Sequence, residues 1–122
     1  MGSEGLHEPA ELLGEATIDR HRAFTSLIEE LQAVDWYDQR VHATSDSSLA
    51  DILAHNRDEE KEHASMTLEW LRRRDAVLDR HLRTYLFTAE PVTEVEAEAE
   101  AEGEPASVGP GSLGIGSLRG SE

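Results

Sequence analysis

Apolar residues recur at intervals of three and four positions in the N-terminal third of the chain. The most regular row consists of Ala23, Leu27, Val34, Tyr37 and Val41, and it is widened by Phe24, Ile28 and Leu31. This period places the row on one side of an α-helix. Pro9 suits a first helical turn because its ring fixes φ and it has no amide hydrogen to leave unpaired. The pattern predicts a long amphipathic helix from about residue 8 to about residue 42.

A cluster of turn-forming residues at positions 44–48 separates this helix from a second one. Ser48 and Asp51 resemble a capping box, so the second helix is expected to open at Ser48 and to run to about Arg74. Its row consists of Leu49, Leu53, Asn56, Glu60, His63, Thr67 and Trp70. Asp75 can cap a short third helix. The sequence therefore predicts an all-α fold, in which an antiparallel two-helix hairpin is followed by one short helix.

The composition of the chain changes near residue 90. Residues 1–92 hold the helical pattern, whereas 93–108 are dominated by glutamate and alanine, and 109–122 by glycine and serine. The acidic segment repels itself and holds almost no large apolar side chain, which predicts an extended, solvated linker. The glycine-rich segment spaces three apolar residues along a flexible strand: Leu113, Ile115 and Leu118.

The overall composition narrows the classes of function. A chain of 122 residues with 38% hydrophobic residues forms one small domain at most, which excludes a large self-contained enzyme. It contains no cysteine, so disulfide scaffolds, zinc-thiolate fingers, iron–sulfur clusters and thiol nucleophiles are excluded. The net charge of −15 repels nucleic acids and anionic membranes and attracts cations. Neither a membrane span nor a secretory signal is evident, so we expect a cytoplasmic location.

Charged residues occupy positions in these rows where apolar residues are expected. Glu30 falls in the row of the first helix, and Glu60 and His63 fall in the row of the second. An ionised side chain is rarely buried without an opposite charge or a metal, because removing it from water costs several kcal/mol. These three residues therefore require a shared explanation.

Glu60 and His63 form a Glu-x-x-His motif, whose spacing brings both side chains to one face of a helix. Counted from a turn centred on Asp46, Glu30 lies 16 residues before and Glu60 lies 14 residues after, so we expect them to face each other. Di-iron carboxylate bundles use one glutamate from each of two helices and a Glu-x-x-His from each of two others. One chain supplies half of this set. We therefore expect a homodimer that holds two iron or manganese ions on its twofold axis.

Further polar residues lie close to these candidate ligands. Glu29 and Gln32 flank Glu30, where a solvated surface and a metal-uptake site are both open interpretations. Tyr37 lies on the ligand row, either as a core aromatic or as a hydrogen-bond donor to a ligand carboxylate. A second polar row lies on another face of the second helix and comprises His55, Glu59 and Glu62. That row is either ordinary solvated surface or a weak outer cation site.

Residues 29–37 (EELQAVDWY) and 55–63 (HNRDEEKEH) carry the clearest resemblance to a known family. Together with residues 68–75 (LEWLRRRD), they make the sequence similar to the encapsulated ferritins over about residues 4–92. The resemblance implies a hairpin that dimerises into a ferritin-like four-helix bundle, and a ring-shaped decamer that oxidises iron without enclosing a mineral store. It also implies that the ferroxidase ligands are Glu30, Glu60 and His63.

By the same resemblance, Tyr37 lies near the site and Trp36 at the dimer interface, while Glu29 and Gln32 occupy the iron-uptake positions. Gln32 departs from the family pattern, and its neutral amide attracts Fe(II) less strongly than a carboxylate does. Residues 111–119 (GSLGIGSLR) resemble the peptide that directs cargo proteins into encapsulin shells. The apolar side chains of this peptide suit the pockets of a groove, and several copies on one ring bind by avidity. The resemblance therefore implies a location in the lumen of an encapsulin nanocompartment in the bacterial cytoplasm.

The function that these observations favour is a ferroxidase that delivers Fe(III) for storage, with O₂ or peroxide as the oxidant. Two alternatives stay open. In the first, the domain binds divalent cations without turnover, as a buffer or a metal-dependent assembly protein. In the second, the helices only assemble and their acids are solvated. The ligand row disfavours the second alternative, because uncompensated carboxylates on a dimer axis repel each other.

Deletion of residues 109–122 is expected to abolish loading into encapsulin shells without slowing iron oxidation, because the glycine-rich tail is separate from the ligand row. Co-expression with a shell protein followed by co-purification measures loading, and the absorbance of the purified protein after Fe(II) addition measures oxidation. Loss of oxidation together with loading would show that the tail is misassigned.

Overall fold

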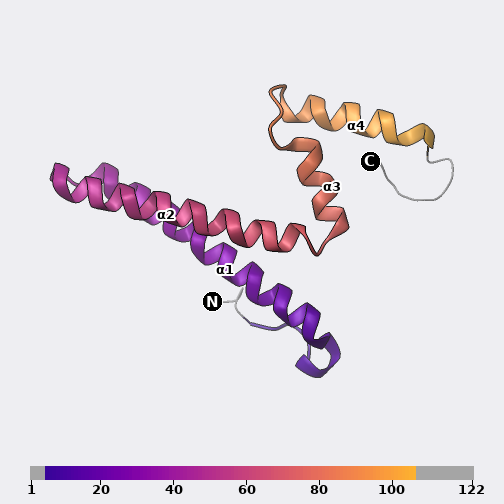
Figure 1. The fold of residues 1–122 in the computed structure, drawn as a ribbon, viewed down its shortest axis with the longest axis horizontal. Coiled ribbons are helices and arrows are strands. Elements are labelled where there is room, and N and C mark those ends of the chain that lie inside the picture. The colour runs from indigo at the N-terminus through magenta and orange to yellow at the C-terminus, as the bar shows by residue number, and fades with distance from the viewer. Residues whose placement is uncertain (1–4, 107–122) are drawn as a thin grey trace. The chain divides into compact units, whose positions relative to one another are not determined.

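A computed structural model describes residues 5–106 of the chain. These residues form four helices: α1 (Ala10–Ala43), α2 (Ser47–Arg72), α3 (Ala76–Tyr85) and α4 (Val92–Ala106) (Figure 1). The chain divides into two units after Leu71. The all-α prediction is confirmed. No helix among residues 5–106 combines the length and the hydrophobicity that a transmembrane segment needs.

α1 is a long helix with a break near its start. Gly14 has φ 81° and ψ 161°, a conformation that residues with a Cβ atom rarely adopt. The regular part of α1 therefore begins after Gly14 and continues to Ala43. There Thr44 turns to an extended backbone and donates its amide to the Arg40 carbonyl at 3.2 Å. The observed bounds agree closely with those that the apolar row predicts.

The residue that caps α2 is Asp46. Its carboxylate accepts the Leu49 amide at 3.0 Å, and its carbonyl accepts the Ala50 amide at 2.9 Å. The prediction that Ser48 opens this helix is wrong, because α2 begins at Ser47 and Ser48 already lies in the first turn. Aspartate and serine are about equally good N-caps, so the sequence alone did not separate the two candidates.

α1 and α2 lie side by side as an antiparallel hairpin (Figure 1). Hydrogen bonds that join them include one from the Arg57 guanidinium to Asp38 at 2.9 Å and one from the Thr67 hydroxyl to Glu30 at 3.3 Å. Every member of the predicted α1 row is half-buried, as is every member of the α2 row from Leu53 onward. The predicted rows are therefore the surfaces through which the two helices contact each other.

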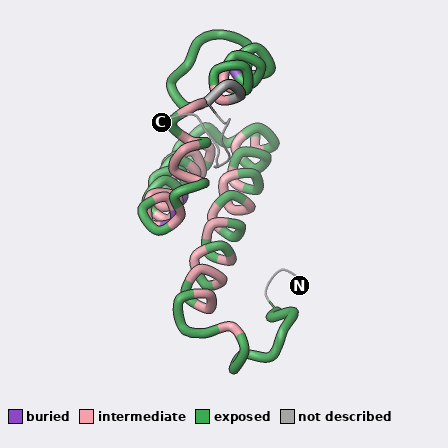
Figure 2. The backbone as a smooth tube through the Cα atoms, turned by 90° about the vertical axis from the view of Figure 1, so that its right-hand side faces the viewer, coloured by how far each residue is buried: buried purple, intermediate pink, exposed green. Residues whose placement is uncertain are grey.

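The hairpin nevertheless buries few of its residues. α1 contains no buried residue, and α2 contains two, Ala64 and Leu71 (Figure 2). Large apolar side chains of α1 remain between 38% and 55% exposed: Phe24, Ile28, Leu31 and Trp36. Large apolar side chains that are exposed on one helix in this number are typical of a surface that another protein chain covers.

The second unit, which follows Leu71, contains α3 and α4, and these two helices contact each other. α3 begins as predicted, because the Asp75 carboxylate accepts the amides of Val77 and Leu78, each at 3.0 Å. The Asp79 carboxylate of α3 accepts a hydrogen bond from Arg83 at 2.9 Å and is also paired with Arg72.

The acidic segment does not have the extended conformation that its charge predicts. It forms α4, so the expectation of an extended linker at residues 93–108 is wrong for the part that the structure describes. Glutamate and alanine are both strong helix formers, and Glu94 in the first turn interacts favourably with the helix dipole. Val95 is buried and anchors the helix. The predicted targeting residues, Leu113, Ile115 and Leu118, lie outside the described residues.

Replacing Asp46 with alanine is expected to destabilise the hairpin by about 1 kcal/mol, because the Leu49 amide loses its capping acceptor. The free energy of unfolding in urea measures the effect. Ser48→Ala is the matched control and is expected to change that free energy much less. A larger loss for Ser48→Ala than for Asp46→Ala would contradict the observed cap.

A cluster of charges holds α2 to α1 near the turn. The Arg57 side chain is 19% exposed, and it donates to Asp38 of α1 at 2.9 Å and to its neighbour Asp58 at 3.0 Å. Hydrogen bonds from Arg57 and then from Lys61 hold the pKa of Asp58 below its ordinary value of 3.8. The hydrogen bonds that Arg57 donates to Asp58 and Asp38 raise the pKa of Arg57.

A carboxyl group whose pKa is lowered by folding stabilises the protein above its unfolded pKa, and this stabilisation disappears as the pH falls through the folded-state value. Asp58→Asn is therefore expected to lower the free energy of unfolding at pH 7, and the difference from the wild type is expected to shrink below about pH 4. Urea unfolding over a pH series measures this difference. Asp51→Asn removes another exposed acid of α2 and controls for the loss of charge alone. A difference that persists undiminished at low pH would contradict the assignment.

Candidate metal centre

Glu30, Glu60 and His63 all lie on the half-buried rows where α1 and α2 contact each other. Each was expected there because it interrupts an apolar row with a polar side chain. All three residues are therefore partly removed from solvent, although the His63 side chain is still 45% exposed. As the sequence indicated, the charge on this surface requires a compensating partner.

Glu60 and His63 come together within one helix. The His63 Nδ1 atom lies 3.5 Å from the Glu60 Oε1 atom, and the two side chains are 45% and 28% exposed, respectively. Residues three positions apart lie on the same face of a helix, so both can reach one cation without any change in the backbone. The Glu-x-x-His motif thus has the geometry that its spacing predicts.

Glu30 has an unusual environment for a carboxylate. Its Oε2 atom accepts a hydrogen bond from the Thr67 hydroxyl at 3.3 Å. Its Oε1 atom is buried and has no hydrogen-bond partner among the residues that the structure describes. A buried carboxylate oxygen without a donor is costly unless a cation approaches it. Glu30 therefore provides a metal-ligand candidate on grounds that are independent of the sequence motif.

The pairing of the two helices differs from the one that counting from the turn predicts. Glu30 accepts a hydrogen bond from Thr67, which lies seven residues beyond Glu60 along α2, a distance of about 10 Å. The expectation that Glu30 and Glu60 face each other within one hairpin is therefore wrong. Counting residues from the turn assumes that positions equally far from the turn lie opposite each other. It ignores the tilt of side chains toward the N-terminus of their own helix. In an antiparallel pair, this tilt directs Glu30 toward the C-terminal part of α2.

A single chain does not assemble a complete metal site from these residues. Within residues 5–106, no three His, Asp or Glu side chains converge closely enough to hold a metal ion. The chain brings Glu60 and His63 together and places Glu30 beside Thr67, about one turn beyond His63 and two turns beyond Glu60 along α2. Each hairpin thus presents two separate groups of metal-ligating atoms on one contact surface.

The accessory positions around Glu30 are mixed in exposure. Glu29 is exposed, whereas Gln32 is half-buried. Trp36 is 51% exposed, although it is the largest side chain of α1. Tyr37 is half-buried, and the Arg40 guanidinium lies 5.5 Å from the centre of its ring. Of these residues, Trp36 and Glu29 are the most available to a second chain or to solvent.

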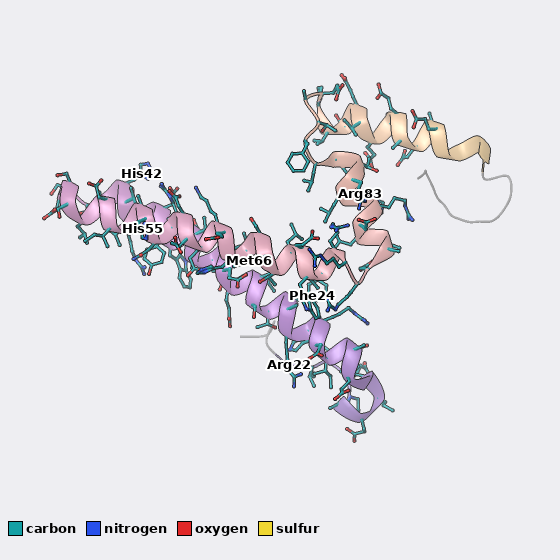
Figure 3. The ribbon with its side chains drawn as sticks, viewed as in Figure 1. Arg22, Phe24, His42, His55, Met66 and Arg83 are labelled. Carbon is teal, nitrogen blue, oxygen red and sulfur yellow. The ribbon has the colours of Figure 1, made fainter. Side chains whose placement is uncertain are left out.

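Within the second polar row of α2, which comprises His55, Glu59 and Glu62, Glu59 lies close to a candidate ligand. The Glu59 Oε2 atom lies 4.0 Å from the His55 Nε2 atom, and the Glu59 Oε1 atom lies 4.0 Å from the His63 Nε2 atom. Glu62 is exposed. His55 is 73% exposed and projects from α2 (Figure 3). The sequence assigned Glu59 to a separate face, but its side chain spans the space between that face and His63.

A groove of about 500 Å³ runs beside Glu30 in the hairpin unit. Its lining comes from both helices and comprises Asp19, Arg22, Ala23, Ser26, Glu30, Met66, Thr67 and Trp70. Arg22 belongs to α1 and Met66 to α2 (Figure 3). The groove therefore lies next to the Glu30 carboxylate, one of whose oxygens has no hydrogen-bond donor among the described residues.

Thr67 contacts the candidate ligand Glu30, but it was not among the candidate site residues predicted from the sequence. It belongs to the predicted α2 row, four positions after His63. The sequence feature that could have identified it is its polar side chain, which continues the Glu60–His63 row by one more turn. Its significance depends on the pairing of the two helices, which the sequence does not specify.

Comparisons with known proteins agree on one family. The chain is 60% identical to the encapsulated ferritin-like protein of Rhodospirillum rubrum, over 98% of this chain and 91% of that protein. It is 51% identical to the ferritin-like protein of Thermotoga maritima, over 95% of this chain and 99% of that protein.

A solved structure supports the same conclusion. The crystal structure of protein ne0167 from Nitrosomonas europaea matches 72% of this chain and 97% of its own chain, with a TM-score of 0.70 and 58% identity. The family model described as EncFtn-like matches residues 5–89, which include both long helices and every candidate ligand. The resemblance that the sequence indicates is thereby confirmed, and the chain belongs to the EncFtn-like family.

Proposed function

We propose that two copies of this chain form a ferroxidase that oxidises Fe(II) to Fe(III), with Glu30, Glu60 and His63 of both copies as the ligands of two iron ions. The observation that carries the proposal is the Glu30 carboxylate, whose Oε1 atom is buried without a hydrogen-bond partner among residues 5–106. A cation is the partner that removes this cost most directly. The same contact surface presents the Glu60–His63 pair.

The chemistry of the donors suits iron. Carboxylate oxygen and imidazole nitrogen bind iron and manganese well, and the chain has no thiolate to favour softer metals. One glutamate and one Glu-x-x-His per chain make half of the ligand set of di-iron carboxylate bundles, so two chains complete it.

A second copy also accounts for the open apolar face of the hairpin. The partly exposed side chains of α1, Phe24, Ile28, Leu31 and Trp36, belong to the same helix as Glu30. Covering them stabilises a dimer by removing apolar surface from water. Iron on the dimer axis then compensates the carboxylates that would otherwise repel each other. We include in the proposal that such dimers associate further into a ring-shaped decamer.

The residues of the site favour the oxidised product. Anionic oxygen ligands stabilise Fe(III) more than Fe(II), because the higher charge gains more from each carboxylate. Two Fe(II) ions together release two electrons, which with two protons from solvent reduce one O₂ to one hydrogen peroxide, or one hydrogen peroxide to two water molecules. The acidic surface of the chain raises the local concentration of Fe(II).

We further propose that the protein is cargo of an encapsulin shell, in whose lumen it delivers Fe(III) for storage. The relative from Rhodospirillum rubrum is named as an encapsulated protein, and it is similar over nearly the whole chain. The apolar residues of the glycine-rich tail, Leu113, Ile115 and Leu118, are the proposed contacts with the shell protein.

Glu30→Ala and His63→Ala are each expected to reduce the rate of Fe(II) oxidation by more than the roughly 10- to 100-fold that loss of a group outside the ligand set causes. The absorbance of Fe(III) after aerobic addition of Fe(II) measures the rate. Glu15→Ala, which removes an exposed acid of the same helix, is the matched control and is expected to keep the wild-type rate. Wild-type rates in Glu30→Ala or His63→Ala would contradict the assignment.

Anaerobic titration with Fe(II), followed by oxygen, separates the proposal from its alternatives. A ferroxidase binds two Fe(II) per dimer and then consumes oxygen. A metal-dependent assembly protein binds Fe(II) and changes its oligomeric state, but consumes no oxygen. A purely structural assembly forms oligomers in native mass spectra without any bound metal.

A further inference from the structure

Thr67 occupies a position between the two groups of candidate ligands. Its Oγ1 atom lies 3.3 Å from the Glu30 Oε2 atom and 3.2 Å from the backbone carbonyl oxygen of His63. Thr67 is half-buried, and it lines the groove beside Glu30. One side chain of α2 thus contacts the carboxylate of α1 and the helical turn that carries His63.

The hydroxyl of Thr67 has one proton and two acceptors in reach. Threonine inside a helix commonly donates to the carbonyl four residues earlier, which here is that of His63. The carboxylate of Glu30 is the stronger acceptor, because a hydrogen bond to an ionised group is stronger than one to a neutral carbonyl. The Glu30 carboxylate therefore competes effectively with the His63 carbonyl for the Thr67 proton.

We infer that Thr67 is the positioning residue of Glu30: its hydroxyl fixes Oε2 and leaves Oε1 as the oxygen with free lone pairs for the cation. This inference rests on the proposed function, since it assumes that Glu30 is a metal ligand. The two oxygens of Glu30 differ in the structure in this way, because only Oε2 has a donor among the described residues. A carboxylate held by one oxygen binds a metal in one orientation, and it loses less side-chain freedom when the metal arrives.

The inference also explains why this position holds a polar residue. Position 67 belongs to the half-buried row of α2, where valine has nearly the same shape as threonine and no hydroxyl to satisfy. If the residue served only in packing, valine would be at least as suitable. The hydroxyl matters if Glu30 must be oriented.

The test compares the full-length wild type with Thr67→Val and Thr67→Ser. Thr67→Val keeps the shape and removes the hydroxyl, whereas Thr67→Ser keeps the hydroxyl and removes a methyl group. The matched control is Thr84→Val, because Thr84 of α3 donates to the Arg80 carbonyl at 3.0 Å in the same i to i−4 geometry and has no carboxylate contact in the structure.

Two quantities are measured on each assembled protein: the affinity for Fe(II) under anaerobic conditions, and the visible absorption spectrum of the Co(II)-loaded protein, which reports the ligand geometry. Thr67→Val is expected to weaken Fe(II) binding by about 10- to 100-fold and to shift the Co(II) spectrum. Thr67→Ser is expected to restore both to near wild-type values, and Thr84→Val is expected to leave both unchanged.

Wild-type Fe(II) affinity and an unchanged Co(II) spectrum in Thr67→Val would overturn the inference. A loss that Thr67→Ser fails to rescue would also overturn it, because the effect would then come from packing. If Thr67→Val does not fold, the pair Thr67→Ala and Thr67→Ser decides the matter, since the two differ only in the hydroxyl. Normal binding without oxidation in the wild type would contradict the ferroxidase proposal alone. A wild type that binds no Fe(II) would overturn both.

Discussion

The two long helices of this chain contact each other through surfaces that contain charge. Glu30 on α1 and the Glu60–His63 pair on α2 lie on the half-buried rows of the hairpin, where apolar residues normally supply the stabilisation. Burying charge on such a surface is costly unless each charged group acquires a partner. Thr67 provides part of that compensation for Glu30, and one carboxylate oxygen stays without a donor among the described residues. The proposed iron site and the proposed dimer are both consequences of this single constraint.

Much of the architecture follows from local sequence signals. The period of the apolar row fixed the extent of α1, and the Asp75 cap located α3, because both depend on residues close together in the chain. The same rows also identified Glu30, Glu60 and His63 as anomalous, since a polar residue in an apolar row is visible without any knowledge of the fold. The half-buried state of all three agrees with that interpretation.

The features that the sequence did not specify depend on contacts between distant residues, or on two local sequence preferences that favour different structures. Asp46 and Ser48 are both suitable caps, and only the closure of the turn selects Asp46. The acidic segment combines repulsion, which favours an extended chain, with high helix propensity, and in α4 the propensity is the stronger effect. The contact of Glu30 with Thr67 depends on the relative placement of two helices, which counting along the chain approximates poorly. The role proposed for Thr67 was not visible for the same reason.

The absence of any buried residue in α1 also affects the energetics of the protein. A helix whose residues are at most half-buried within its own chain gains only part of the possible packing free energy, so in the proposed dimer folding and association are coupled. The folded fraction then depends on the protein concentration, and dilution shifts the equilibrium toward unfolded monomers. In a cell, newly made copies that have not yet met one another are the ones most exposed to proteolysis, which links the lifetime of the protein to its rate of synthesis.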